Sequence, residues 1–222
     1  ATNIKYIGLF ATGFNNIDTE YTNEHGITVC NAGSYSTEAV AQHTFALILN
    51  HFSRILDYAN FVKQDGWKES KVFSPFVYPL FELTGKNLGI VGYGSIGKRV
   101  SEIGQAFGMN VYVYTRTKRE VPGIHFVDWD TFLAKSDIIS VHCPLNKESE
   151  LLFDENAFSH CKKGCFFVNT ARGAIVDEDA LYDALEKEQL SGAGIDVLTE
   201  EPMARDSRLT KAKNITITPH VA

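Results

Sequence analysis

Short apolar runs alternate with segments of helical periodicity along most of the chain. The apolar runs predict strands at residues 5–11, 88–91, 111–114, 124–127, 138–142, 166–170, 193–197 and 215–218. Between them, apolar residues recur every three or four positions, which predicts helices at residues 36–58, 96–107, 129–134, 155–160 and 178–188. Regular alternation of strands and helices is typical of a parallel sheet that helices cover on both faces. The pattern therefore predicts an α/β fold.

The predicted helix at residues 36–58 is long and rich in apolar positions between Val40 and Leu49. An irregular stretch follows it and contains several aromatic residues, namely Trp67, Phe73, Phe76, Tyr78 and Phe81. A helix and a stretch of this kind either pack on their own domain or form a dimer interface. The sequence leaves both alternatives open.

A glycine motif stands between the predicted strand at residues 88–91 and the helix that follows it. Gly92, Gly94 and Gly97 have the spacing G-x-G-x-x-G. In this context the first glycine allows a tight turn, the second lets the backbone approach a diphosphate, and the third brings the helix close to the sheet. Because free N–H groups at a helix N-terminus attract anions, the motif predicts a dinucleotide site on a Rossmann-type, doubly wound sheet.

Composition narrows the class of protein. The chain has 222 residues, of which 44% are hydrophobic, and its net charge is −6 without a long run of one sign. Neither a nucleic-acid footprint nor an apolar run near the ~20 residues of a membrane span is present. The cysteines (Cys30, Cys143, Cys161 and Cys165) lack zinc or redox spacing. We therefore expect buried thiols in a reducing cytoplasm, and no metal site.

Polar residues follow the predicted strands at the points where ligands bind in open α/β sheets. They comprise His142-Cys143-Pro144, Thr170-Ala171-Arg172-Gly173, Asp196, Glu200-Glu201-Pro202 and Pro219-His220. The topology thus brings an arginine, carboxylates and a histidine to the edge that holds the dinucleotide. Hydride transfer between a nicotinamide cofactor and a 2-hydroxy acid needs side chains of these three kinds. Histidine exchanges the hydroxyl proton, a carboxylate orients its ring, and arginine binds the substrate carboxylate.

Several segments resemble the D-isomer-specific 2-hydroxyacid dehydrogenases, in the order in which that family carries them. They are ATGFNNID (11–18), VGYGSIGKRV (91–100), HCPLNKES (142–149), NTARGAIVDEDAL (169–181), GAGIDVLTEEP (192–202) and TPHVA (218–222). ATGFNNID together with AQHTFALIL (41–49) is most similar to the glycerate dehydrogenase, or hydroxypyruvate reductase, branch. The resemblance implies reduction of a small 2-keto acid, with hydroxypyruvate or glyoxylate as the preferred substrate pair.

The resemblance also implies a role for individual residues. Arg172 would bind the substrate, Glu201 would pair with His220, and His220 would be the general acid and base. Backbone N–H groups near Thr12 and Gly13 would meet the substrate carboxylate. The cofactor would contact the glycine turn and the loops after the strands, namely Gly92, Gly94, Ser95, Ile96, Gly97, Cys143, Pro144, Thr170, Ala171 and Asp196. Glu200 would lie on the solvated surface.

The end of the second Rossmann strand bears on the choice of cofactor. An NAD-preferring site usually carries Asp or Glu there, but this chain has Thr115, Arg116 and Thr117, followed by Lys118 and Arg119. Because cations pair strongly with a 2′-phosphate, we expect NADP to be favoured over NAD. The alternative is a solvated basic turn that tolerates either cofactor.

The domain organisation follows from the same resemblance. The chain starts without methionine, and residues 5–11 resemble an interior strand, so we expect a part of a longer polypeptide. Residues 1–32 would belong to a flavodoxin-like substrate domain, and residues 33–222 would form the NAD(P)-binding domain with its long linking helix. The family resemblance further implies a cytoplasmic homodimer.

A second class of function stays open at this point. The same family contains dinucleotide-sensing corepressors, which retain the arginine, glutamate and histidine. Turnover of a 2-keto acid would favour the enzyme, whereas tight cofactor binding without turnover would favour the sensor.

Overall fold

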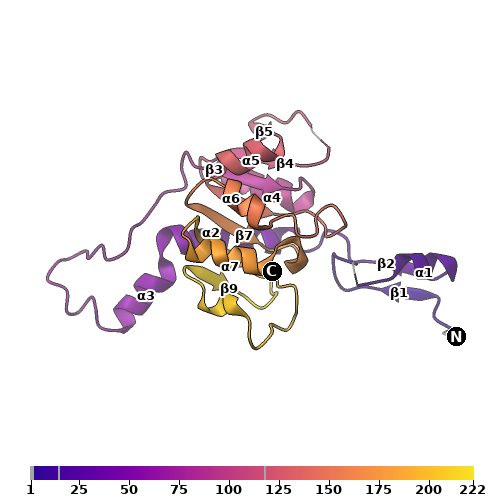
Figure 1. Cartoon of the computed structure of the whole chain (residues 1–222), viewed down its shortest axis with the longest axis horizontal. Coiled ribbons are helices and arrows are strands. Elements are labelled where there is room, and N and C mark those ends of the chain that lie inside the picture. Colours follow the sequence, from indigo (N-terminus) through magenta and orange to yellow (C-terminus); the bar gives the residue numbers. More distant parts are fainter. Residues whose placement is uncertain (1–2, 15, 118) are drawn as a thin grey trace.

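The computed structural model describes residues 3–14, 16–117 and 119–222, and its centre is a seven-stranded parallel sheet (Figure 1). The strands lie in the order β5-β4-β3-β6-β7-β8-β9. Their bounds are β3 (Asn87–Val91), β4 (Asn110–Tyr114), β5 (Ile124–Phe126), β6 (Ile138–Val141), β7 (Cys165–Asn169), β8 (Leu190–Ile195) and β9 (Ile215–Ile217). Every pairing is parallel. The predicted doubly wound α/β sheet is confirmed.

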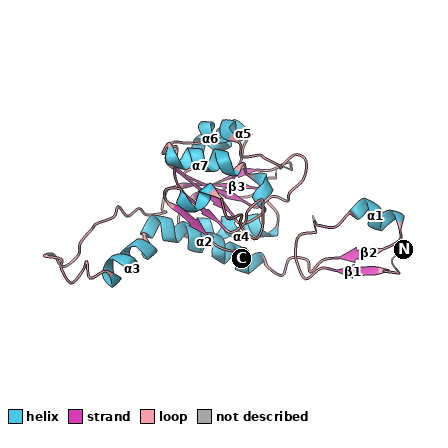
Figure 2. Ribbon diagram, turned by 60° about the horizontal axis from the view of Figure 1, so that its bottom comes forward, coloured by secondary structure: helices cyan, strands magenta, loops and turns pink. Residues whose placement is uncertain are grey.

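Helices cover both faces of this sheet (Figure 2). One face packs against α2 (Thr37–Ser53) and α4 (Ser95–Ala106), and the other packs against α5 (Trp129–Lys135), α6 (Glu155–His160) and α7 (Glu178–Glu186). Short 3-10 helices span Gly173–Ile175 and Arg208–Lys211. The strands β3, β6 and β7 are almost wholly buried, which explains their continuous apolar sequences.

Two apolar clusters hold the layers together. Phe45 and Val100 lie in the cluster beneath α2 and α4, while Phe132 and Phe158 lie in the cluster beneath α5, α6 and α7. Each fully buried side chain of this size contributes about 1.5–3 kcal/mol relative to exposure. Asp177 caps α7 as predicted, because its carboxylate accepts hydrogen bonds from the backbone N–H groups of Asp179 and Ala180.

The helix predicted at residues 36–58 is not continuous. It breaks at Arg54, whose φ of 50° is left-handed, and the chain continues as α3 (Ile55–Lys63) in a new direction. The Asn50 side chain accepts the backbone N–H of Leu56 beyond the break. The sequence contains neither glycine nor proline there, so the usual signal for a break is missing.

A second, two-stranded parallel sheet stands apart from the main one (Figure 1). It consists of β1 (Tyr6–Gly8) and β2 (Thr28–Cys30), connected through α1 (Thr19–Glu24). β1 covers three residues of the strand expected at residues 5–11, and Tyr6 in it is 60% exposed. That these residues come from the interior of a longer polypeptide stays a prediction. The proposed boundary between residues 32 and 33 stays a prediction.

The cysteines are free thiols, but they are not all buried. Cys161 and Cys165 are buried and Cys143 is partly buried, whereas Cys30, on β2, is exposed. Burial raises the pKa of the Cys161 thiol to about 12. Among the described residues, no helix has the length and apolar character needed to cross a bilayer.

Candidate active site

Backbone hydrogen bonds align the carboxyl ends of the strands into one edge. The N–H of Gly92 donates to Tyr114, and that of His142 donates to Val91. Further along the sheet, Asp196 N–H donates to Asn169, and His220 N–H donates to Asp196. The predicted convergence of polar residues from separate strands is therefore present. The switch in strand order lies between β3 and β6, beside the glycine turn.

The three motif glycines occupy three different environments. Gly92 has a φ of +88°, and a Cβ there would lie 2.8 Å from the backbone of Cys143. A Cβ on Gly97 would lie 2.1 Å from the carbonyl oxygen of Gly92, so this glycine sets how closely α4 approaches the sheet. A Cβ on Gly94 would meet nothing within 4 Å. The space next to Gly94 is where a ligand can reach the backbone.

The N-terminus of α4 opens onto this space. Gly94 is its N-cap, no side chain caps the helix, and no acidic residue lies in its first turn. The backbone of Ser95 and Ile96, together with the helix dipole, suits a diphosphate. These observations fit the dinucleotide that the motif predicts.

A cavity of about 280 Å³ lies beside the glycine turn. Its walls include many of the predicted cofactor residues, namely Gly92, Gly94, Thr115, Arg116, Thr117, Cys143 and Pro144. Arg119 also lines it, whereas Lys118 lies outside the described residues. Sequence reasoning missed Tyr93, Asn146, Glu148 and Ser149, which also line the cavity. Tyr93 lies within the glycine motif, and the other three lie in the segment HCPLNKES after β6, but neither pattern by itself assigns these side chains to the cavity.

The cavity wall at the end of β6 is uncharged at neutral pH. Desolvation lowers the pKa of His142 to about 3, and its Nε2 lies 2.8 Å from Ser140 Oγ. Burial likewise raises the pKa of Cys143 to about 11. A neutral imidazole and a neutral thiol present a surface of low polarity, which suits the adenosine side of a dinucleotide.

His220 and Glu201 form a hydrogen-bonded pair. The distance between His220 Nδ1 and Glu201 Oε2 is 2.6 Å, and the other carboxylate oxygen accepts the backbone N–H of Leu198 at 2.9 Å. The side chains are 45% and 37% exposed, so a small molecule can reach them. Because the Nδ1 proton is directed to Glu201, Nε2 is the nitrogen available for proton exchange. Glu200 is exposed, as expected.

The loop that carries Arg172 packs directly on the loop that carries Glu201. A Cβ on Gly173 would lie 1.8 Å from the backbone of Leu198. The Asn169 side chain fixes the loop, because it donates to the Arg172 carbonyl and accepts from the N–H of Ala171. The Thr170 hydroxyl lies 3.1 Å from that of Thr44 on α2. This packing brings the arginine and the histidine pair to neighbouring loops.

Asp196 lies beneath the loop that carries His220. Its carboxylate is 1% exposed and accepts hydrogen bonds from the Thr218 hydroxyl and from the backbone N–H groups of Val221 and Ala222. His43 Nε2 lies 3.5 Å from it and 2.9 Å from the Thr218 oxygen. Sequence reasoning missed this support by His43.

The predicted substrate contacts Thr12 and Gly13 lie in the loop between β1 and α1. The Thr12 hydroxyl lies 2.9 Å from Ser36 Oγ, and the Asn31 side chain donates to its carbonyl. These described hydrogen bonds fasten the loop to the start of α2 and do not reach Glu201 or His220. A role for the two residues in substrate binding stays a prediction.

Comparisons with known proteins agree with this geometry. Residues 45–222 match the model of the D-isomer specific 2-hydroxyacid dehydrogenase NAD-binding domain. The chain is 37% identical to a hydroxypyruvate reductase of Blautia hydrogenotrophica, covering 99% of this chain and 69% of that protein. It is 39% identical to a glyoxylate reductase of Thermococcus litoralis, covering 100% of this chain and 68% of that protein.

Solved structures show the same likeness. A D-lactate dehydrogenase of Aquifex aeolicus, complexed with NAD and lactic acid, superposes with a TM-score of 0.87 and 36% identity, over 98% of this chain and 68% of the other. An acyclic imino acid reductase in complex with NADPH and D-Arg superposes with a TM-score of 0.87 and 35% identity, over 97% and 68%. With its dinucleotide-binding fold, the chain belongs to the family of NAD(P)-dependent, D-isomer specific 2-hydroxyacid dehydrogenases.

Proposed function

We propose that this protein reduces a small 2-keto acid, hydroxypyruvate or glyoxylate, to the corresponding 2-hydroxy acid. The observation that carries the proposal is the His220–Glu201 pair, joined at 2.6 Å on the sheet edge that also holds the dinucleotide cavity. The hydroxypyruvate and glyoxylate reductases among its relatives support this choice of substrate. The pair supplies what the reaction needs besides a hydride, namely an oriented proton donor.

Three residues have different roles toward the substrate, namely Arg172, Glu201 and His220. A bound nicotinamide cofactor supplies the hydride for the carbonyl carbon. The Arg172 guanidinium binds the substrate carboxylate and polarises the adjacent carbonyl. His220 gives the proton at Nε2 to the forming hydroxyl, while Glu201 keeps the ring oriented and stabilises its protonated form. In the reverse direction, neutral His220 accepts the hydroxyl proton.

NADPH is the cofactor that we propose to be favoured over NADH. Thr115 stands at the end of β4, and Arg116 and Arg119 line the cavity next to it. The first carboxylate after the strand is Glu120, which does not line the cavity. The NADPH-bound imino acid reductase shows that a relative with this fold accepts the phosphorylated cofactor.

We further propose a cytoplasmic homodimer. The free cysteines support a reducing compartment, where thiols persist. Exposed apolar side chains on α3 and the segment after it support a partner, because patches of this kind mark interfaces. The proposed partner is a second copy of the chain.

Turnover and its loss in one variant test the function. Oxidation of NADPH and of NADH is measured for the full-length protein with hydroxypyruvate, glyoxylate and pyruvate. We expect turnover with the first two acids, and a fall of about a thousandfold in kcat for His220→Ala. His160→Ala, which removes an exposed histidine at the end of α6, serves as the matched control.

Two results would contradict the proposal. Intact cofactor binding without turnover of any of the three acids would instead favour a dinucleotide sensor. A tenfold advantage of NADH over NADPH at equal concentration would overturn the cofactor preference while leaving the reaction itself in place.

A further inference from the structure

An ion pair lies at the cavity beside the glycine turn. Arg116 Nη1, on the turn after β4, lies 3.4 Å from Glu148 Oε2, on the loop after β6. Both residues line the cavity, from different loops. Their side chains are 77% and 72% exposed, so the pair contributes little to the stability of the fold. The pair instead holds the Arg116 guanidinium, which a 2′-phosphorylated cofactor would also bind.

The loop that presents Glu148 is fixed by its own hydrogen bonds. Asn146 Oδ1 accepts the backbone N–H groups of Glu148 and Ser149. The Ser149 hydroxyl in turn donates to the Pro144 carbonyl at 2.7 Å. These contacts make a compact turn, and they keep the carboxylate facing the basic residues after β4.

Glu148 stands out by its charge. Among the described residues that line this cavity, it is the only carboxylate, whereas Arg116 and Arg119 are both cationic. A 2′-phosphate carries nearly two negative charges and would pair with the same guanidinium. A ribose 2′-hydroxyl carries none and can donate a hydrogen bond to a carboxylate. The Glu148 carboxylate therefore disfavours the cofactor with a 2′-phosphate and favours the one with a 2′-hydroxyl.

We infer that Glu148 is a specificity-determining residue for the cofactor: its carboxylate competes with a 2′-phosphate for Arg116 and so restrains the preference for NADP(H). This inference rests on the proposed function in one respect, namely that the cavity receives the adenosine end of the dinucleotide. It assigns to the loop after β6 a part of the discrimination that is ordinarily sought at the end of β4.

Direct binding of the two cofactors tests the inference. Dissociation constants of NADPH and NADH are measured by fluorescence titration of the full-length protein, without substrate, for the wild type and Glu148→Gln. We expect the ratio of affinities to move toward NADPH by about threefold or more, since the carboxylate that competes for Arg116 is removed. Glu150→Gln, an exposed glutamate of the same loop outside the cavity, is the matched control.

A second variant tests whether the competition involves Arg116. In an Arg116→Ala background, Glu148→Gln should change the NADPH affinity by less than half of its effect in the wild type. A ratio that moves by less than about threefold, or toward NADH, would overturn the inference, as would an equal gain in both backgrounds. If the wild type prefers NADH, the proposed preference fails, yet the shift caused by Glu148→Gln is still measured.

Discussion

At the scale of single residues, the buried Asp196 holds the loop of His220, the proposed general acid and base. Asp196 accepts hydrogen bonds from a hydroxyl and two backbone N–H groups of residues 218–222, so its carboxylate fixes the loop on both sides of His220. Because the Thr218 hydroxyl donates its proton to Asp196, it accepts from Nε2–H of His43. His43 on α2 is thereby connected to the loop that carries His220. A contact of Asp196 with the nicotinamide, as the family resemblance implies, stays a prediction.

We predict that Asp196→Asn lowers kcat by at least about tenfold. An amide has one acceptor oxygen where the carboxylate has two, so at least one donor of the loop loses its partner inside the protein. If Asp196 acts by positioning His220, the dissociation constant of the cofactor should change by less than about threefold. Steady-state kinetics and cofactor titration separate the two effects. Asp206→Asn, at an exposed carboxylate, is the control, and a purely weaker cofactor affinity would contradict positioning.

We predict that His51, on α2, lowers the free energy of unfolding in acid. Desolvation, with a smaller contribution from the Arg54 charge, lowers its pKa from 6.5 to about 4. Between pH 6.5 and about pH 4, the unfolded chain therefore binds a proton that the folded protein does not bind. The free energy of unfolding falls as the pH decreases through this window. Relative to pH 7.5, His51 should cost about 2 kcal/mol of unfolding free energy at pH 5.

Urea denaturation at the two pH values measures this contribution. His51→Gln keeps a polar group near the Ser191 hydroxyl but cannot be protonated, so the decrease between pH 7.5 and pH 5 should shrink. His160→Gln replaces an exposed histidine and should leave the decrease as it is in the wild type. An equal decrease in the wild type and in His51→Gln would show that His51 is not responsible.

At the scale of elements, the sequence predicts what depends on local periodicity. The strands of the main sheet and helices α4 to α7 lie where apolar spacing places them, within a few residues. The break at Arg54 could not be predicted, because a non-glycine residue enters the left-handed region there under tertiary constraint. Likewise, Glu148 belongs to the segment at residues 142–149, but its place at the cavity follows from the strand order, which sets β4 and β6 on either side of β3.

The same change, from glycine to alanine, should have different effects at two positions of the glycine turn before α4. Gly97→Ala places a methyl group 2.1 Å from the Gly92 carbonyl oxygen, so the fold should lose about 2 kcal/mol or more. Gly94→Ala meets no neighbour, and its φ of −83° is ordinary, so stability should change by less than about 0.5 kcal/mol. Its methyl group should instead weaken cofactor binding by about tenfold, by blocking the diphosphate.

Thermal unfolding and cofactor titration on both variants provide the measurements. Each variant is the control of the other, since both add a single methyl group within the same motif. Equal affinities of the wild type and Gly94→Ala would argue that the diphosphate does not approach the turn at this glycine.

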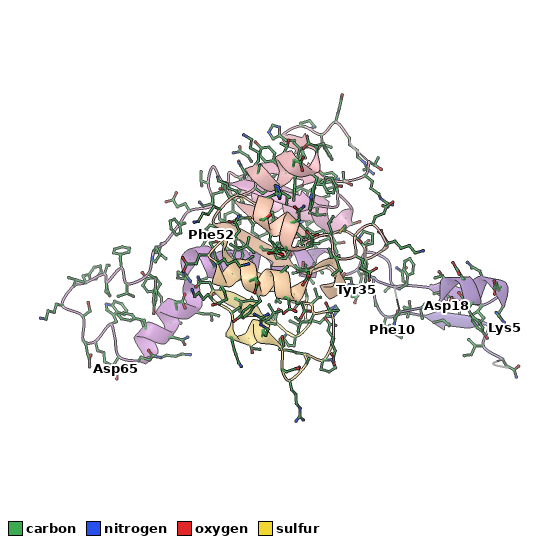
Figure 3. The ribbon with its side chains drawn as sticks, viewed as in Figure 1. Lys5, Phe10, Asp18, Tyr35, Phe52 and Asp65 are labelled. Atoms are coloured by element: carbon green, nitrogen blue, oxygen red, sulfur yellow. The ribbon has the colours of Figure 1, made fainter. Side chains whose placement is uncertain are left out.

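The whole molecule extends well beyond its central sheet. Figure 3 shows Asp65 on the projection formed by α3 and the segment after it, and Lys5 and Asp18 on the small lobe at the opposite side. No residue of α3 is buried, although its sequence is amphipathic. Phe73 is 89% exposed and Phe76 is 79% exposed, which is unusual for two phenylalanines so near each other in sequence. A projection of this composition needs an apolar partner.

We therefore predict that the full-length protein is a dimer that the projection at residues 55–81 holds together. Phe73→Asp combined with Phe76→Asp should produce a monomer at micromolar concentration, because charges placed in an apolar interface lose their hydration without gaining a partner. Sedimentation velocity measures the mass, and circular dichroism checks that the fold is retained. Leu151→Asp, at a leucine that is 53% exposed elsewhere on the surface, should leave the dimer intact. A wild type that stays monomeric at these concentrations would mean that another apolar surface covers the projection.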